Sequence, residues 1–168
     1  MTRRIILGFA AATLLAAGVA QADSADSMNG SDWVKLKSLV GSWQGTAEGR
    51  PVSATYALVS NGTVLMETLN SGPDADMITM YAPDGATLLA THYCSIGNQP
   101  RMRATASGDG KSLDFQFVDV SNVKGSGDHV MQRLVVTFVD ANHFNQQWTS
   151  RGPDGKEQTS LFQYTRRK

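Results

Sequence analysis

From Trp43 to the C-terminus, apolar and polar residues alternate with a period of two. In the segment around residue 115, for example, Leu113, Phe115 and Phe117 would share one face of a strand, with Asp114 and Gln116 on the other. Such alternation is typical of antiparallel strands that bury one face and expose the other.

Turn-forming residues interrupt this alternation at regular intervals, and pairs such as Asn61-Gly62 and Asp84-Gly85 are strong hairpin signals. Short hairpins without a long crossover disfavour a parallel sheet and a β-sandwich. Closure into a barrel also removes exposed strand edges. We therefore predict an all-β fold, a single up-and-down antiparallel β-barrel of about ten strands, at about 42–49, 51–60, 63–70, 76–82, 86–95, 100–107, 112–120, 129–139, 143–150 and 156–166.

A short helix is expected before the first strand. Ser31 or Asp32 can cap it, Trp33, Leu36 and Leu39 or Val40 fall at helical spacing, and Gly41 ends it. Residues 23–30 are small and polar, which predicts a flexible lead-in.

The first 22 residues have the features of a secretory signal peptide. Arg3 and Arg4 precede an uncharged stretch over 5–20, and Ala20-Gln-Ala22 is a small-x-small cleavage site. The alternative, a transmembrane anchor, needs a longer apolar stretch. We expect cleavage after Ala22, a periplasmic or secreted protein without an integral membrane segment, and one barrel domain over 31–168.

Net charge and cysteine content exclude some classes of partner and of binding site. Loss of Arg3 and Arg4 with the leader changes the formal net charge from zero to −2, and no block of like charge follows, so we expect no nucleic-acid partner. Cys94 is the only cysteine, so no internal disulfide and no Cys₄ or CxxC site can form.

Two resemblances accompany this pattern. Gly41-Ser42-Trp43, where a helix enters the first strand, resembles the lipocalin signature. In lipocalin-like (calycin) barrels the tryptophan closes the base and a basic residue of the last strand stacks on it, which implies that role for Arg166 or Arg167. Such a contact is favourable by roughly 0.5–2 kcal/mol. The alternative is a core tryptophan beside a turn glycine.

The segments 77–81 and 91–102 also resemble a group of bacterial exported proteins of lipocalin-like or nitrobindin-like type that has no established activity. The resemblance implies a fold and no chemistry. Nitrobindin-like barrels hold haem through a histidine near the end of the chain, but no histidine follows His143 here. We therefore expect no haem and no other cofactor.

The densest group of candidate site residues surrounds one hairpin. Leu88 and Ala90 precede His92 on its side of a strand, so His92 is expected to point inward. His92 with Cys94 could contact the polar part of a ligand or a soft metal, but two side chains do not complete a metal site. The alternative is a satisfied interior histidine beside a buried thiol. The ligand-binding candidates in this group are His92, Tyr93, Cys94, Asn98 and Arg101.

Glu67 is the remaining ligand-binding candidate. It is the only acid in the expected strand 63–70, where it could pair with Arg101 or Arg103 inside the barrel or face solvent. Asp140 and His143 are expected to form a hairpin turn rather than a catalytic pair. Motifs for nucleophilic serine catalysis, phosphate loops and dinucleotide binding do not occur.

The leading hypothesis is a non-catalytic protein that binds a small, largely apolar molecule, because a ten-stranded barrel is wide enough to enclose a cavity. Methionines in the expected strands, such as Met77 and Met131, would suit an adaptable lining or simply fill the core. Two alternatives remain. One is a barrel enzyme, an isomerase, lyase or hydrolase that uses His92 with Glu67 or Tyr93, and the other is a protein-interaction module without a pocket.

Overall fold

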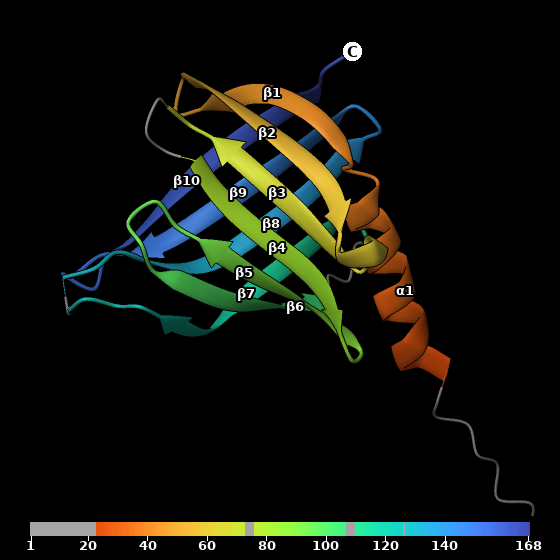
Figure 1. Ribbon diagram of the computed structural model, residues 1–168, viewed down its shortest axis with the longest axis horizontal. Helices are drawn as coiled ribbons and strands as arrows, with labels where there is room; N and C mark the ends of the chain where they lie inside the picture. The colour runs from red at the N-terminus through yellow and green to blue at the C-terminus, as the bar shows by residue number, and fades with distance from the viewer. Residues whose placement is uncertain (1–22, 73–75, 107–109, 126) are drawn as a thin grey trace, which may run out of the picture.

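The computed structural model describes residues 23–72, 76–106, 110–125 and 127–168. Ten strands form one closed barrel in which every neighbouring pair is antiparallel (Figure 1). The strands are β1 (Gly41–Ala47), β2 (Arg50–Val59), β3 (Val64–Asn70), β4 (Asp76–Asp84), β5 (Thr87–Tyr93), β6 (Gln99–Ala106), β7 (Ser112–Ser121), β8 (Val130–Asp140), β9 (His143–Arg151) and β10 (Glu157–Arg166).

The up-and-down arrangement is confirmed. Each strand pairs with the strand before and after it in sequence, and β1 pairs with β10 to close the barrel. The predicted turns that lie within the described residues connect the strands as expected, with the short 3-10 turn Ser60–Gly62 between β2 and β3. Parts of the predicted turns at 71–74, 108–110 and 125–128 lie outside the described residues. Gly85, between β4 and β5, has a φ of 60°, a conformation that glycine adopts without strain.

Helix α1 (Asp23–Lys37) precedes the barrel and covers one of its ends (Figure 1). Leu36 is fully buried, and Leu39 in the following turn is 2% exposed, so both contribute to the core. The helix begins eight residues before the expected cap at Ser31 and includes residues 23–30. Whether those residues are mobile stays a prediction, and the expected signal peptide lies outside the described residues.

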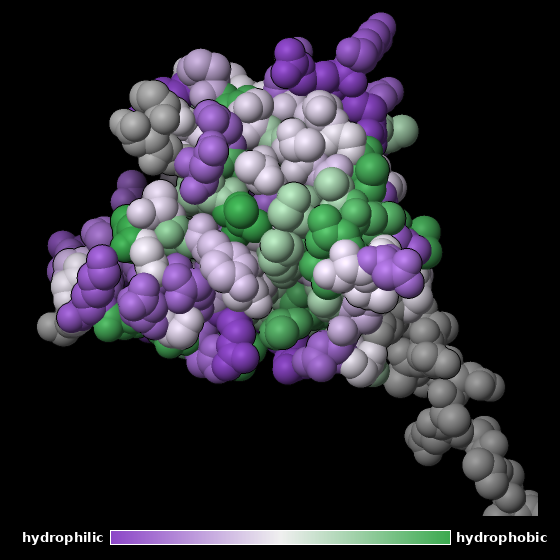
Figure 2. Space-filling view, viewed as in Figure 1, coloured by the Kyte–Doolittle hydropathy of each residue, from purple (hydrophilic) through white to green (hydrophobic). Residues whose placement is uncertain are grey.

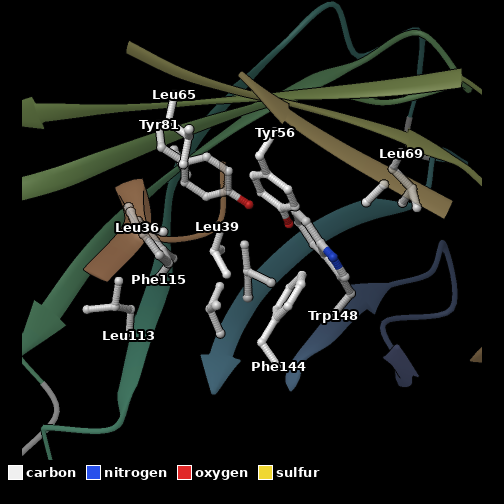
Figure 3. Packing of buried hydrophobic residues seen from close by; sticks show 14 of the residues in the cluster. Leu36, Leu39, Tyr56, Leu65, Leu69, Tyr81, Leu113, Phe115, Phe144 and Trp148 are labelled. Atoms are coloured by element: carbon white, nitrogen blue, oxygen red, sulfur yellow. The ribbon is translucent and has the colours of Figure 1, made fainter. Parts of the chain in front are cut away.

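Aromatic rings fill the barrel near α1. Phe144 meets Trp43 edge to face at 4.7 Å between ring centroids and stacks on Tyr164 at the same distance. Tyr56 also meets Phe144 edge to face, at 5.8 Å between ring centroids, and Figure 3 shows Tyr56 beside Tyr81. Such edge-to-face and stacked pairs add to the stability gained by burying large apolar surfaces.

The predicted closure of the base is confirmed, with Arg166 rather than Arg167 as the partner of Trp43. Arg166 donates from Nη1 to the carbonyl of Val40 at 2.9 Å and from Nη2 to that of Ser38 at 2.7 Å. These bonds tie the last strand to the connection between α1 and β1. A Cβ on Gly45 would lie 2.0 Å from the carbonyl oxygen of Gln163, so β1 and β10 can approach this closely only with glycine there.

One expected core residue is more exposed than predicted. Leu113 and Phe115 are fully buried, but Phe117 on the same strand is 37% exposed. The register of β7 with β8 runs only from Ser112 to Gln116, so Phe117 lies beyond the part of β7 that β8 covers.

The barrel therefore has two different ends. The α1 end is closed by the helix, Trp43 and Arg166. At the opposite end, here called the loop end, lie the connections β1–β2, β3–β4, β5–β6, β7–β8 and β9–β10. The outside mixes hydrophilic and hydrophobic residues on the face seen in Figure 2.

Candidate functional site

A row of four inward-facing polar residues crosses β2 to β5. Tyr56 is the cross-strand partner of Glu67, Glu67 of Thr79, and Thr79 of His92. All four are at most 2% exposed. The predicted inward orientation of His92 is confirmed, and Glu67 faces the interior rather than solvent.

Glu67 is held by neutral donors from two strands, β4 and β9. The hydroxyl of Tyr81 donates to Oε2 at 2.6 Å, and Nε2 of Gln146 lies 3.0 Å from both carboxyl oxygens. Nε1 of Trp148 donates to Oε1 of Gln146 at 3.3 Å. Because an indole N–H can only donate, it turns the amide so that Nε2 faces Glu67.

Burial dominates the electrostatics of this cluster. It raises the pKa of Glu67, and the hydrogen bonds from Tyr81 and Gln146 partly oppose that shift. The pKa values of Tyr56 and Tyr81 are raised well above the usual range, first by burial and then by the charge of Glu67. The phenols are therefore neutral hydrogen-bonding groups at ordinary pH.

His92 has one ring nitrogen fixed and the other without a partner. Nδ1 lies 2.9 Å from the hydroxyl oxygen of Thr79, and the ring packs against Trp148 with 4.7 Å between centroids. Nε2 is buried and has no hydrogen-bond partner among the described residues. Burial lowers the pKa of His92 to about 4, so the ring is neutral at neutral pH.

A cavity of about 90 Å³ lies beside His92 at the loop end. Its wall is mainly apolar and is contributed by strands from both sides of the barrel, including Leu69, Met77, Met131, Trp148 and Phe162. Ser150, Gln158 and Ser160 add neutral polar groups. A second hollow of about 170 Å³ shares Ser160 and Phe162 with it and continues toward Glu48 and Arg50.

The other predicted site residues do not join His92 in this cavity. Tyr93 is 47% exposed and lies on the outside of the barrel with Arg101. Arg101 forms an ion pair with Asp119, and Arg103 forms one with Asp84. The expected pairing of Glu67 with either arginine is wrong, because both arginines are on outward positions of β6 while Glu67 points inward.

Cys94 and Asn98 shape the hairpin after β5. The backbone N–H of Cys94 donates to the carbonyl of Asn98 at 3.1 Å, and Nδ2 of Asn98 donates to the carbonyl of His129 at 2.8 Å. Asn98 thereby connects this hairpin to the connection between β7 and β8. Cys94 is half-buried and free, and neither residue lines the cavity.

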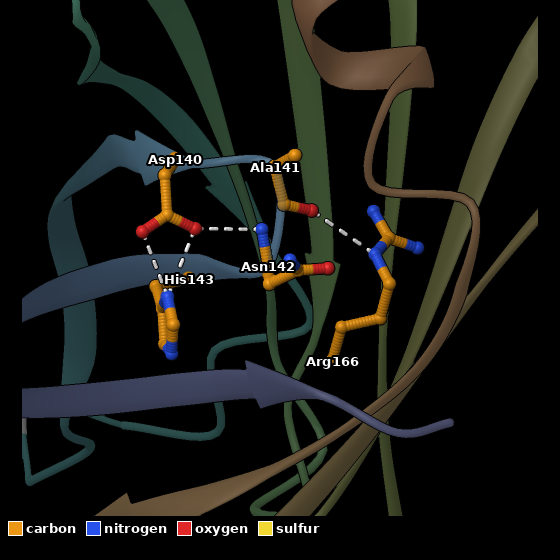
Figure 4. Close-up of polar contacts among 5 residues, drawn as sticks. All are labelled: Asp140, Ala141, Asn142, His143 and Arg166. Carbon is orange, nitrogen blue, oxygen red and sulfur yellow. Dashed lines mark hydrogen bonds and ion pairs between the residues drawn. The ribbon is translucent and has the colours of Figure 1, made fainter.

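Asp140 and His143 form the expected hairpin turn (Figure 4). The carboxylate of Asp140 accepts from the backbone N–H of Asn142 at 2.7 Å and contacts Nδ1 of His143 at 2.8 Å. Both side chains are about half exposed. The pair lies at the α1 end, where Arg166 donates to the carbonyl of Ala141.

Tyr56, Tyr81, Gln146 and Trp148 were not predicted as site residues. The alternation along β2, β4 and β9 would place their side chains inside, but period alone does not show which inward residues meet across a barrel. In the described residues, no group of three His, Cys, Asp or Glu side chains could hold a metal ion. Nor does the described part of the chain contain a helix with the length and apolar character to cross a membrane.

The sequence matches no protein-family model and no curated protein. Solved structures that share its fold include the following two. One is Rv2717c from M. tuberculosis, with a TM-score of 0.60 and 14% identity over 80% of this chain and 96% of that one. The other is a protein of unknown function from the DUF3598 family of Nostoc punctiforme PCC 73102, with a TM-score of 0.55 and 14% identity. That alignment covers 79% of this chain and 48% of the Nostoc protein, so the chain spans about half of its length.

Proposed function

We propose that this chain is an exported, non-catalytic binding protein that holds a small, largely apolar molecule in the cavity beside His92. The observation that carries the proposal is His92, which lines the cavity and whose buried Nε2 has no hydrogen-bond partner among the described residues. An unpaired buried polar group costs roughly 1–3 kcal/mol, which a ligand with one hydrogen-bonding group would recover.

The cavity restricts the ligand in size and polarity. About 90 Å³ is less than most ligand pockets offer, so the occupant has few non-hydrogen atoms. Leu69, Met77, Met131 and Phe162 supply an apolar surface, and the methionines can adjust to shape. The neutral ring of His92 favours a neutral polar group over an anion.

The positions of the acid–base candidates favour binding over catalysis. A general acid and base need to lie within hydrogen-bond reach of the reacting atoms. Tyr93 is outside the barrel, and Glu67 is two strands from His92, about 10 Å away at ordinary strand spacing. Among the described contacts of His92, its hydrogen bond goes to Thr79 alone.

The test uses protein labelled with ¹³C at the methionine methyl groups and titrated with benzene or phenol. We expect the signals of Met77 and Met131 to shift, because both line the cavity. The signals of Met66 and Met80, a cross-strand pair on the outer face, provide the internal control and should stay unchanged. Phenol should bind more tightly than benzene because it can pair with Nε2.

His92→Phe then tests the role of the nitrogen. This variant keeps a ring beside Trp148 and should reduce the preference for phenol over benzene. Ser150→Leu, which fills part of the cavity, should weaken both probes. Equal shifts of all four methionine signals, or no shift at saturating probe, would contradict the proposal and favour an interaction module.

A further inference from the structure

Three side chains in the cavity wall carry atoms that bind soft metal ions. His92 on β5 offers Nε2, while Met77 on β4 and Met131 on β8 each offer a thioether sulfur. Met77 and Met131 are partly buried and pack against the core. The cavity has room for only a few water molecules, so the three residues border one small space.

The imidazole ring of His92 is oriented by its surroundings, and its Nε2 could bind a metal ion. Thr79 occupies Nδ1, and such a partner on the second nitrogen is the usual support of a metal-binding histidine because it fixes the orientation of the ring. Nε2 has no partner among the described residues. Burial also keeps the ring neutral, so no proton has to be displaced.

The rest of the wall suits a single positive charge rather than a divalent ion. Among the described residues no carboxylate lines this cavity, and the rest of that lining is apolar or neutral. The ring of Trp148 lies beside His92, and an indole face attracts a cation. Thioether sulfur with imidazole selects Cu(I), whereas Mg²⁺ and Ca²⁺ prefer carboxylate and carbonyl oxygens.

We propose that this cavity binds one Cu(I) ion through Nε2 of His92 and the Sδ atoms of Met77 and Met131, with Trp148 beside the ion. The inference goes beyond the proposed function, because a metal ion is a different occupant from an apolar molecule. The two occupants share a wall and would exclude each other.

The test is an anaerobic titration of purified protein with Cu(I), buffered by the chromogenic chelator bicinchoninate. We expect one ion per chain. Met77→Leu and Met131→Leu should each weaken Cu(I) binding by at least about tenfold, since even the loss of a residue behind a ligand costs about 10–100-fold. These substitutions conserve volume, so the fold should persist. The matched control is Met66→Leu with Met80→Leu, which removes two thioethers from the outer face of β3 and β4.

Cys94 is the rival soft ligand, because it is a free and half-buried thiol near the same end. The titration is therefore repeated with Cys94→Ser, which should retain Cu(I) binding and its dependence on both methionines. Loss of binding in Cys94→Ser, or equal weakening by the inner and outer methionine pairs, would overturn the proposal. So would binding of Zn²⁺ at the same residues with similar affinity.

The methionine signals distinguish this proposal from the proposed function. Cu(I) should shift the methyl signals of Met77 and Met131 in protein to which no benzene has been added. Bound Cu(I) should then prevent benzene from shifting these signals. Methionine signals that shift with benzene but not with Cu(I) would contradict the metal site and leave the proposed function intact. Methionine signals that shift with Cu(I) but not with benzene or phenol would contradict the binding of apolar molecules and leave the metal site intact.

Discussion

The guanidinium carbon of Arg166 lies 4.1 Å from the centroid of the indole ring of Trp43, and the two residues are register partners on β10 and β1. Nε1 of Trp43 donates to the carbonyl of Leu39 at 2.7 Å. The two side chains thus join the first strand, the last strand and the segment after α1. Nearly the whole barrel lies between them in sequence, so they can be in contact only when β1 and β10 close the barrel.

We predict that Trp43→Ala destabilises the protein by roughly 3–5 kcal/mol, because the ring is fully buried and its loss leaves a cavity. Arg166→Lys should cost about 1–3 kcal/mol, since an ammonium group cannot reproduce the planar set of donors. Arg167→Lys at the exposed neighbouring position is the control. Urea denaturation measures all three, and a loss below about 0.5 kcal/mol for Trp43→Ala would contradict the role of this ring.

The buried carboxyl of Glu67 makes a double-mutant cycle informative. Tyr81→Phe should destabilise the protein by about 1–3 kcal/mol, because it removes the donor at 2.6 Å and leaves the carboxyl less satisfied. In a Glu67→Gln background the same change should cost less. Tyr93→Phe on the outer face should be close to neutral. Additive losses in the cycle would mean that the two groups do not interact.

Stability should depend on pH through His92. Its pKa falls from 6.5 to about 4 on folding, so the unfolded chain binds a proton in this interval and the native ring does not. The contribution of His92 to the free energy of unfolding is complete above pH 6.5 and is lost as the pH falls to about 4. The total loss is about 3 kcal/mol, because each pKa unit of the shift corresponds to about 1.36 kcal/mol.

The comparison that isolates this effect is the free energy of unfolding of the wild type minus that of His92→Phe. Glu67 contributes with the opposite sign, because its raised pKa makes stability fall as the pH rises above 4.5, but it is present in both proteins. A difference that stays constant from pH 7 to pH 4 would show that His92 is not a buried neutral ring.

Export is a prediction from the first 22 residues. The protein recovered from the periplasm or the medium should begin at Asp23 and contain 146 of the 168 residues. Intact mass spectrometry of that fraction measures the cleavage site, and replacement of Ala20 and Ala22 by larger residues should block processing. A protein that keeps Met1 and stays in the cytosol would refute the prediction.

The order and number of strands could be predicted because they depend on local chemistry. Asp-Gly and Asn-Gly turns and a period of two act within a few residues, and the observed strands differ from the expected ones by two residues or fewer at every boundary. The start of α1 and the exposure of Phe117 were harder to predict from the sequence, because they depend on where a helix frays and where two strands separate.

Alternation and chain order in the sequence are enough to predict a closed ten-stranded meander and the inward direction of His92. The contact of Trp43 with a C-terminal arginine was implied by the resemblance to lipocalin-like barrels. Which inward residues meet one another depends on the tertiary structure. Glu67 faces Gln146 rather than Arg101, and His92 shares a cavity with Met77 and Met131, because curvature and register bring together strands far apart in sequence. Contacts across a barrel depend on this closure, and no local pattern encodes it.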